Sequence, residues 1–448
     1  MSQNYAIKTE TLENGLRVIV CHAPHNSFFE ANMHVNVGAR DEKEPHSGIS
    51  HFLEHMMFRG SKNYPSSLSL SRALEALGGE SNAMTSVEST SYWLRGDTTK
   101  SKLGLELFSE FFLNPLFNDI DIERKIILQE LASDYNEEGS HIDVESLAFK
   151  ALFKTHPLSY PVIGHEKSIK AITKDDLKDY YETHYTAKNC ILTFLSPLSF
   201  EDSFASIRKS FSDFNSKSQS QYTRESFPGF NKQSLSKKSS DNYNFIFQNN
   251  PDNQFSVKFL FPFSPSNKKL LVGATFLSRV LDDGLSTRLP KLLREKHGLV
   301  YDVSTDCQIL SDCGFFSVDC TVSKENLEKI LEPVRQEISH LAKESLCDKE
   351  VEHIKFRYLF DLKQMTVTPE KVLYRQANLC CQGLYFSLEE EIEILKKLDA
   401  KFLLSLSKTI FRAEHSGCVL VGPRARKKRE TFKSFFTNFK KILGSESL

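Results

Sequence analysis

Residues 49–61 read ISHFLEHMMFRGS, and this stretch decides what the rest of the chain must build around it. The pattern predicts a helix from Gly48 to Phe58. His51 and His55 are four residues apart, so on a helix they lie one turn apart on one face and can reach a single metal ion. Glu54 lies at the edge of the same arc, where it can touch a metal-bound water without being a ligand. This is the inverted form of the zincin motif, H-x-x-E-H, and it favours a metal centre. The alternative is two histidines and a glutamate on a solvated helix face.

A third protein ligand is expected on another element, because a catalytic zinc ion usually has three protein ligands and one open position. Glu130 is the best candidate, because it sits among apolar residues in the helical stretch IERKIILQEL, residues 122–131. Glu123 lies seven residues earlier on the same stripe of the helix, where it could hydrogen-bond the ligand shell. The alternative for both glutamates is ordinary charge on a helix surface.

The metal-binding stretch has a weaker copy half the chain length later. Residues 51–60 read HFLEHMMFRG, and residues 275–284 read TFLSRVLDDG. A second pair sets IERKIILQEL beside VEHIKFRYLF at 351–360. In this alignment the metal-type residues His51, Glu54 and His55 face Thr275, Ser278 and Arg279. The repeat predicts two related domains with one functional site; the alternative is chance similarity between amphipathic helices.

Strands and helices alternate without the regular period of a doubly wound sheet, which predicts an α+β fold. We expect two homologous domains, each a mostly antiparallel sheet with helices packed on it. Residues 200–242 are rich in Ser, Lys, Gln and Asn and can bury little apolar surface. We therefore expect an N-terminal catalytic zinc domain over 1–215, a linker over 216–242 and a metal-free C-terminal domain over 243–448. The expected strands include 16–20, as the first strand of the fold, and 30–37, 83–94 and 189–195.

The composition argues against several classes of protein. Lys and Arg total 57 and Asp and Glu 58, and a net charge of -1 argues against a dedicated nucleic-acid binder. No apolar run is long enough to span a bilayer, and the N-terminus lacks the features of a secretory or organelle signal. The nine cysteines are scattered without a C-x-x-C pair, which favours a reduced, cytoplasmic compartment over a disulfide framework.

Taken in their order along the chain, these motifs resemble the pitrilysin/insulinase family of zinc metallopeptidases, which includes the mitochondrial processing peptidase. The matching stretches span nearly the whole chain: NGLRVIV at 14–20, ISHFLEHMMFRGS, GGESNAMTSVESTSY at 78–92, IERKIILQEL, and LSTRLPKLLREKHGLVYDV at 285–303. The resemblance implies two domains of the processing-peptidase-like metallohydrolase fold. Because the chain has about half the length of the single-chain members, it resembles the half-length bacterial type.

The resemblance also implies the composition of the metal centre. One zinc ion per chain is expected on His51, His55 and Glu130. Glu54 is expected to be the general base on the zinc-bound water, and Glu123 is expected to be a supporting acid. The implied activity is that of an H-x-x-E-H zinc metalloendopeptidase, which hydrolyses unfolded oligopeptides in a closed chamber.

Substrate binding and assembly follow from the same resemblance. Asn82 matches the family's asparagine in the strand that pairs with the substrate backbone, and Arg294 and Tyr301 match its substrate-contacting Arg/Tyr pair. A half-length member needs a second subunit to close the chamber, so we expect a homodimer or a heterodimer with a related subunit. Arg294 and Tyr301 would then act on the partner's zinc site. The alternative function is a non-catalytic scaffold, or a presequence-processing subunit acting with a different partner chain.

Overall fold

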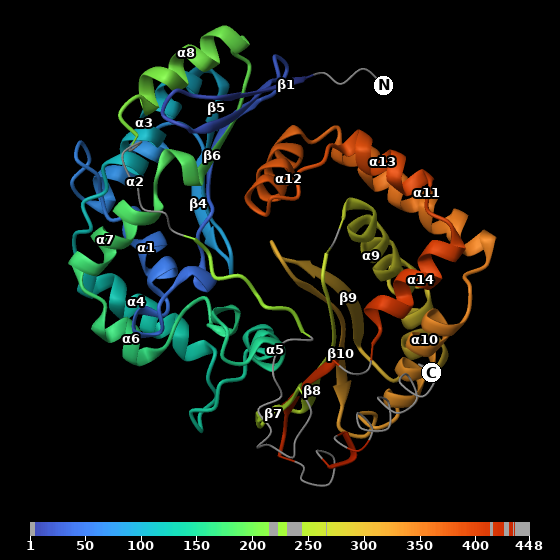
Figure 1. Cartoon of the computed structure of the whole chain (residues 1–448). Coiled ribbons are helices and arrows are strands. Elements are labelled where there is room, and N and C mark those ends of the chain that lie inside the picture. Colours follow the sequence, from blue (N-terminus) through green and yellow to red (C-terminus); the bar gives the residue numbers. More distant parts are fainter. Residues whose placement is uncertain are drawn as a thin grey trace. The chain divides into compact units, whose positions relative to one another are not determined.

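The computed structural model of the chain describes residues 5–214, 223–230, 244–265, 267–412, 415–424, 430–432 and 434 (Figure 1). The chain forms two compact units, each discontinuous in the sequence. Unit 1 contains Met1–Ala132, Tyr160–Glu225 and Lys363–Tyr385. Unit 2 contains Ser133–Ser159, Ser226–Leu362 and Phe386–Leu448. Among the helices of the described ranges, none is long and apolar enough to cross a membrane.

Unit 1 is built on a six-stranded sheet with the order β1-β2-β6-β3-β5-β4. Its strands are β1 (Ala6–Thr11), β2 (Arg17–His22), β3 (Phe28–Val35), β4 (Glu80–Thr85), β5 (Thr90–Asp97) and β6 (Cys190–Ser196). β2 and β6 run parallel, and the other neighbouring pairs are antiparallel. The sheet is therefore mostly antiparallel, as the sequence predicts.

Two expectations for these strands are wrong. The strand expected over 83–94 is a hairpin of β4 and β5, because the chain turns where Ser86 N donates to Ser89 O at 2.8 Å. Serines favour such a turn, since their hydroxyls bond to nearby backbone groups. The strand expected at 16–20 is not the first, because β1 precedes it and pairs with it.

The helices of unit 1 cover both faces of this sheet. They are α1 (Ile49–Met57), α2 (Ser67–Glu75), α3 (Ser101–Leu113), α4 (Ile120–Ser133), α6 (Glu166–Ala171), α7 (Lys174–His184), α8 (Phe200–Phe211) and α12 (Pro369–Cys381), with short 3₁₀ turns η1 (Ala39–Asp41), η2 (Glu44–His46), η3 (Thr98–Lys100) and η5 (Ala187–Asn189). On one face, α3 packs on β3 and β5. Gly104 makes this approach possible, because a Cβ at that position would lie 2.0 Å from Cζ of Phe29.

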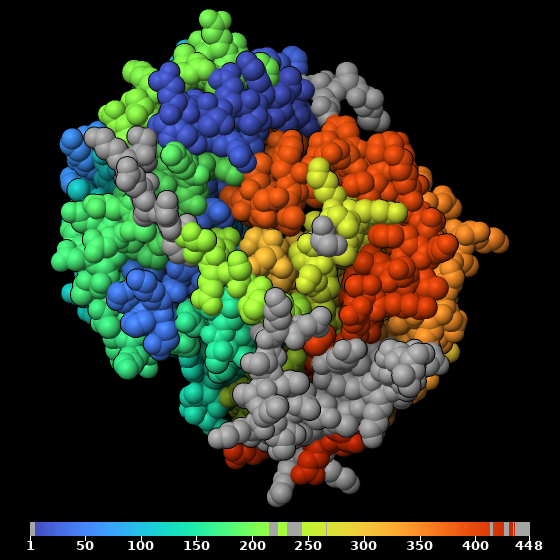
Figure 2. All heavy atoms as spheres, viewed as in Figure 1, coloured from blue at the N-terminus to red at the C-terminus, as the bar shows by residue number. Residues whose placement is uncertain are grey.

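α12 covers the opposite face of the sheet, although it comes from the second half of the chain. Leu373 and Ala377 of α12 are buried against Ile19 of β2 and against Ile191 and Leu195 of β6. In the space-filling view, the orange surface of α12 lies against the blue surface of the first strands (Figure 2). Unit 1 therefore depends on a helix that lies more than 150 residues beyond its last strand in the sequence, which ends at Ser196.

Unit 2 is built on a five-stranded sheet with the order β7-β11-β8-β10-β9. Its strands are β7 (Asn244–Asn249), β8 (Gln254–Phe263), β9 (Asp302–Ile309), β10 (Gly314–Ser323) and β11 (Gly417–Gly422). Its helices are α5 (Val144–Phe153), α9 (Lys268–Leu281), α10 (Leu331–Lys343), α11 (Asp348–Met365), α13 (Leu388–Lys396) and α14 (Ala400–Ile410), with the 3₁₀ turn η4 (Pro157–Ser159) and the π-helical segment η6 (Pro290–Lys296). α5 comes from the first half of the chain and packs on β7, β8 and β11.

The two units repeat one topology. Strands β2, β3, β4, β5 and β6 take the same places and directions in one sheet as β7, β8, β9, β10 and β11 in the other. In each sheet the one parallel pair joins the first and last of these strands. The predicted fold class, two homologous domains with helices packed on mostly antiparallel sheets, is confirmed.

The exchange of α5 and α12 means that each compact unit contains residues from both halves of the chain. The domain limits expected at 215 and 243 stay a prediction. Of the linker expected over 216–242, residues 223–230 are described and the others lie outside the described residues. The Ser-rich composition also extends over Phe200–Phe211, and this part forms α8.

Candidate metal centre

Helix α1 holds both histidines of the H-x-x-E-H stretch on one side. Ile49, Phe52 and Met56 are buried in the core, while the side chains of His51 and His55 are 12% and 22% exposed. The two imidazole rings lie 4.7 Å apart between centroids. The amphipathic spacing therefore buries the apolar face and turns the histidines outward as a pair.

Helix α4 brings Glu130 to this pair. Its Oε1 lies 3.7 Å from Nε2 of His51, and its Oε2 lies 3.6 Å from Nε2 of His55. α4 is oriented by a buried stripe of Glu123, Ile127 and Leu131, which leaves Glu130 about half exposed. One ligand atom from each of the three residues can be chosen so that all lie within 4.8 Å of one another. The sequence-predicted set is thus brought together in space.

This donor set fits a zinc ion. Zinc binds imidazole nitrogen and carboxylate oxygen at about 2.0–2.2 Å in tetrahedral geometry, which places neighbouring ligand atoms roughly 3.4 Å apart. The observed separations of 3.6 and 3.7 Å need only small side-chain adjustments to reach that value. Two neutral imidazoles and one carboxylate are also the ligand types that catalytic zinc sites use.

Glu123 fixes the orientation of His55. Its Oε2 lies 3.1 Å from Nδ1 of His55, and its Oε1 accepts from Nη1 of Arg59 at 3.2 Å. Nη2 of Arg59 also donates to Asp119 at 3.0 Å. A proton shared between Nδ1 and the carboxylate leaves the Nε2 lone pair facing Glu130, which is the arrangement that supports a metal-ligating histidine.

The two histidines differ in their electrostatics. Burial, aided by the neighbouring His55, lowers the pKa of His51 to about 4, so its imidazole is neutral at pH 7. Burial also lowers the pKa of His55, but the hydrogen bond to Glu123 and the charge of Glu54 outweigh it and raise that pKa overall. The carboxylates of Glu123, Glu54 and Glu130 near His55 thus favour positive charge at this site.

Glu54 stays outside the ligand set and is held from β4. Thr85 Oγ1 of β4 donates a short hydrogen bond to Oε2 of Glu54. Burial raises the pKa of Glu54, against the lowering effect of the Thr85 hydrogen bond and of His55. A partly buried carboxylate with a raised pKa beside a metal centre is suited to proton transfer.

The predicted substrate strand is the edge of the sheet of unit 1. β4 is the last strand in the order, so its outer edge has no partner strand in the described part of the chain. Asn82 is exposed on β4, where its Oδ1 accepts from Ala83 N at 2.8 Å. The position is compatible with a strand that receives an extended peptide.

The matching place in unit 2 holds ion pairs. Ser278 Oγ of α9 lies 2.8 Å from Thr305 Oγ1 of β9, which repeats the link from α1 to β4. Arg279 stands where His55 stands in unit 1, and its Nη1 donates to Asp361 at 2.7 Å. A guanidinium held by a carboxylate thus stands where the alignment places the second histidine of unit 1.

Arg294 and Tyr301 belong to unit 2 and are not part of the cluster on α1 and α4. Arg294 lies in η6 with a side chain that is 52% exposed, and its Nε lies 3.7 Å from Glu295. Tyr301 directly precedes β9 and is 82% exposed. Both side chains are therefore accessible, and their role toward a partner's metal centre stays a prediction.

Sequence reasoning missed two side chains of the centre. Thr85 follows Asn82 in the same strand, and its odd spacing from Asn82 puts it on the face toward α1. Arg59 lies in the turn directly after α1, four residues beyond His55, and its closeness to the motif could have indicated a contact with the same acidic cluster. Neither residue type is a usual zinc ligand, so the metal motif alone did not single them out.

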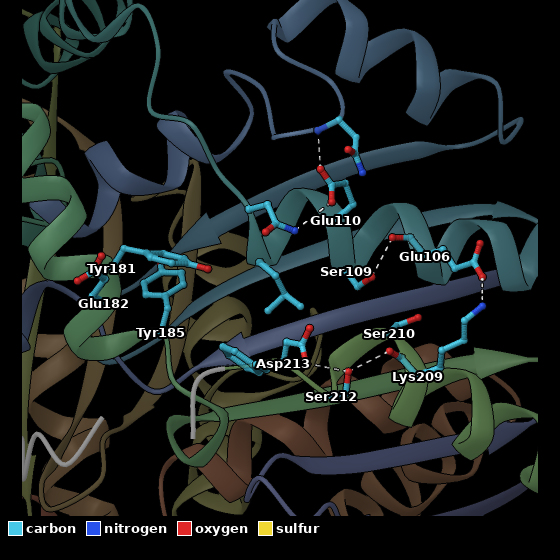
Figure 3. Close-up of a pocket in the computed structure, with 14 residues that line it drawn as sticks. Glu106, Ser109, Glu110, Tyr181, Glu182, Tyr185, Lys209, Ser210, Ser212 and Asp213 are labelled. Carbon is cyan, nitrogen blue, oxygen red and sulfur yellow. Dashed lines mark hydrogen bonds and ion pairs between the residues drawn. The ribbon is translucent and has the colours of Figure 1, made fainter. Parts of the chain in front are cut away.

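Unit 1 also contains a polar cavity of about 390 Å³ between α3, α7 and α8 (Figure 3). Its charged side chains are engaged locally: Glu110 accepts from Asn63 N at 2.7 Å, and Lys209 Nζ lies 3.6 Å from Glu106. The site residues expected from the sequence do not line it. The cavity is therefore separate from the metal centre.

Hydrolytic enzymes of the inverted zincin class hold their metal in this way. Two histidines and a carboxylate from another helix are the ligands, and a second glutamate stays outside the ligand set. Residues 17–166 match the family described as Insulinase (Peptidase family M16), and residues 171–358 match the Peptidase M16 inactive domain. The chain belongs to the M16 peptidase family.

Several relatives are similar over nearly the whole chain. An uncharacterised zinc protease of Rickettsia felis is 26% identical over 94% of this chain and 98% of its own length. An uncharacterised zinc protease of Bacillus subtilis is 24% identical over 93% of this chain and 98% of its own length. A protease from Helicobacter pylori superposes with a TM-score of 0.82 at 22% identity, covering 93% of this chain and 99% of that one. The half-length peptidase type expected from the sequence is confirmed.

Proposed function

We propose that this chain is a zinc-dependent endopeptidase that hydrolyses unfolded oligopeptides. The observation that carries the proposal is the convergence of His51, His55 and Glu130 from two helices, with their ligand atoms within 4.8 Å. When bound there, zinc supplies a Lewis acid that polarises a carbonyl and acidifies water. The relatives named zinc proteases support the same reading.

Glu54 is the proton carrier in this proposal. Its Oε2 is engaged by Thr85, which leaves Oε1 to take a proton from the attacking water and to deliver it to the leaving amine. Thr85 comes from β4, so the strand that would bind the substrate also orients the base. Glu123 holds His55 through Nδ1 and keeps its Nε2 directed at the centre.

β4 would bind the substrate by strand addition. Its outer edge, which pairs with no strand among the described residues, offers backbone groups to an extended peptide, and Asn82 offers an exposed amide beside them. Backbone pairing depends on an extended conformation more than on the sequence of the peptide. It therefore favours unfolded peptides. This binding mode supports broad cleavage with little dependence on the residues at the bond.

The assembled enzyme is proposed to be a homodimer or a heterodimer with a related subunit, which together close a peptide chamber. The exposure of Arg294 and Tyr301 is what such an assembly needs, because they would act on the zinc site of the other subunit. No disulfide bond joins any of the nine cysteines, all of which lie in described ranges, and this supports a location in the reducing cytoplasm.

The test compares three purified proteins, wild type, Glu54→Gln and Glu130→Ala, for zinc content and for cleavage of a quenched peptide. We expect zinc and chelator-sensitive cleavage in the wild type, zinc without cleavage in Glu54→Gln, and loss of both in Glu130→Ala. Normal turnover by Glu54→Gln would refute the role of this carboxylate. Zinc binding without any cleavage by the wild type, alone or with a co-purifying related chain, would favour the scaffold alternative.

A further inference from the structure

Residues 223–225 are held in unit 1 by the side chain of Arg224. They lie within the stretch that the sequence marks as a linker, yet the side chain of Arg224 is only 15% exposed. The chain passes from unit 1 to unit 2 directly after Glu225. Two residues further on, Phe227 N donates to Asp312 of unit 2 at 2.8 Å. Arg224 is therefore held in unit 1 just before the chain leaves it.

Arg224 makes a forked ion pair with a buried carboxylate. Its Nε and Nη2 donate to the two oxygens of Asp41 at 2.7 and 2.8 Å, and the side chain of Asp41 is 0% exposed. Nη2 also donates to the carbonyl oxygens of Glu88 at 2.8 Å and Asn36 at 3.3 Å. Two-point pairing of this kind fixes both distance and orientation.

The partners of Arg224 lead to the hairpin that bears the substrate edge. Glu88 lies in the turn between β4 and β5, three residues after Thr85. Arg40 donates through Nη1 to the Glu88 carboxylate and through Nη2 to Glu225 O at 2.7 Å. Arg40 N also donates to Val87 O at 2.8 Å. The hairpin tip is therefore tied to residues 224 and 225.

The same cluster leads to the start of the metal-binding helix. Glu42 follows Asp41, and its Oε2 and Oε1 accept from Gly48 N at 2.6 Å and Ser50 N at 2.9 Å. These amides belong to the first turn of α1, directly before His51. A carboxylate at the first turn of a helix satisfies amides that have no partner within the helix.

The charges of this cluster balance. Arg40 and Arg224 are cationic, and Asp41 and Glu88 are their partners at 4 Å or less. Burial raises the pKa of Glu42 to about 8, against the lowering effect of its hydrogen bonds from Gly48 and Ser50. Removing the Arg224 guanidinium would take its counterion away from the buried Asp41 carboxylate, which is costly in a protein interior.

We propose that Arg224 is a positioning residue of the metal centre, which holds the start of α1 and the β4–β5 hairpin in register through Asp41 and Glu88. The proposal rests on the proposed function. It holds that this register keeps the proposed ligand His51 on α1 aligned with Thr85 on β4, the residue that orients the proposed base Glu54. Residues 223–225 thus help to set the geometry of the metal centre.

The test uses Arg224→Met and Arg224→Lys, with Arg208→Met as the matched control, because Arg208 makes an exposed ion pair with Glu10 at 2.6 Å. Zinc alone is titrated into the metal-free proteins against a competing chelator, and amide hydrogen exchange is followed. For Arg224→Met we expect about a tenfold weaker zinc affinity, the loss typical of groups that orient metal ligands. We also expect faster exchange confined to residues 48–50 and 85–90. Arg208→Met should match the wild type.

Wild-type zinc affinity and wild-type exchange at residues 48–50 in Arg224→Met would overturn the proposal, even if its melting temperature fell. If Arg224→Met does not fold, Arg224→Lys decides: it keeps the charge but loses the fork, and an affinity equal to the wild type would equally refute the proposal. Both readouts are independent of peptide cleavage. A wild type that binds zinc but cleaves nothing would therefore sink the proposed function and leave the role of Arg224 to be decided separately.

Discussion

Replacing Glu123 by Gln should weaken metal binding while leaving the fold in place. Glu123 is buried and makes two charge-assisted contacts, one to Nδ1 of His55 at 3.1 Å and one to Nη1 of Arg59 at 3.2 Å. The amide keeps the shape of the side chain but removes the negative charge that holds the proton on Nδ1. Loss of such a partner typically lowers metal affinity by about 10- to 100-fold, or about 1.4–2.7 kcal/mol.

The assay is a competition titration of metal-free Glu123→Gln with zinc against a chromogenic chelator at pH 7.5. The matched control is Asp121→Asn on the first turn of the same helix, because the side chain of Asp121 is 83% exposed. The control should bind zinc like the wild type. A dissociation constant for Glu123→Gln within twofold of the wild type would refute the argument that this carboxylate orients His55.

Two further predictions concern stability. Gly104→Ala should lower the free energy of unfolding by about 1–3 kcal/mol in urea titrations, because its Cβ would lie 2.0 Å from Phe29 Cζ. Adding Phe29→Leu to this variant should restore part of the loss. If the losses of the two single variants simply add in the double variant, the predicted clash is contradicted. Burial lowers the pKa of His34 to about 4 against an ordinary 6.5, so its neutral form stabilises the fold above pH 6.5 and this contribution is lost as the pH falls toward 4. Between pH 7 and pH 5 the loss of unfolding free energy amounts to about 2 kcal/mol. The stability of His34→Gln should therefore fall less with decreasing pH than that of the control His25→Gln, because His25 is exposed. Equal slopes of unfolding free energy against pH in the two variants would refute the assignment.

Sequence reasoning found the elements that are specified by residues close to one another in the chain. Helix α1 is specified by its own apolar face, and the four-residue spacing of His51 and His55 needs only helical geometry. Glu130 could be chosen because it sits among apolar residues in a stretch with a helical pattern, IERKIILQEL. The repeat was visible for the same reason, since α1 and α9 share their apolar pattern.

The features that escaped depend on partners far away in the sequence. α12 lies on the sheet of unit 1 because Leu373 and Ala377 bury apolar surface against β2 and β6, and no local pattern states which sheet a helix will cover. Arg224 looks like one polar residue in a Ser-rich stretch, although its carboxylate partner lies 183 positions earlier. The β4–β5 hairpin looks like one strand in the sequence, because residues 86–89 read SVES and contain no Gly, Pro or Asn to mark the turn.

The most direct test of the metal centre is an anomalous diffraction measurement at the zinc edge on crystals of the zinc-loaded protein. The account predicts one strong peak per chain, about 2.0–2.2 Å from Nε2 of His51, Nε2 of His55 and a carboxylate oxygen of Glu130. No peak, or a peak that lacks the Glu130 carboxylate among its ligands, would contradict it.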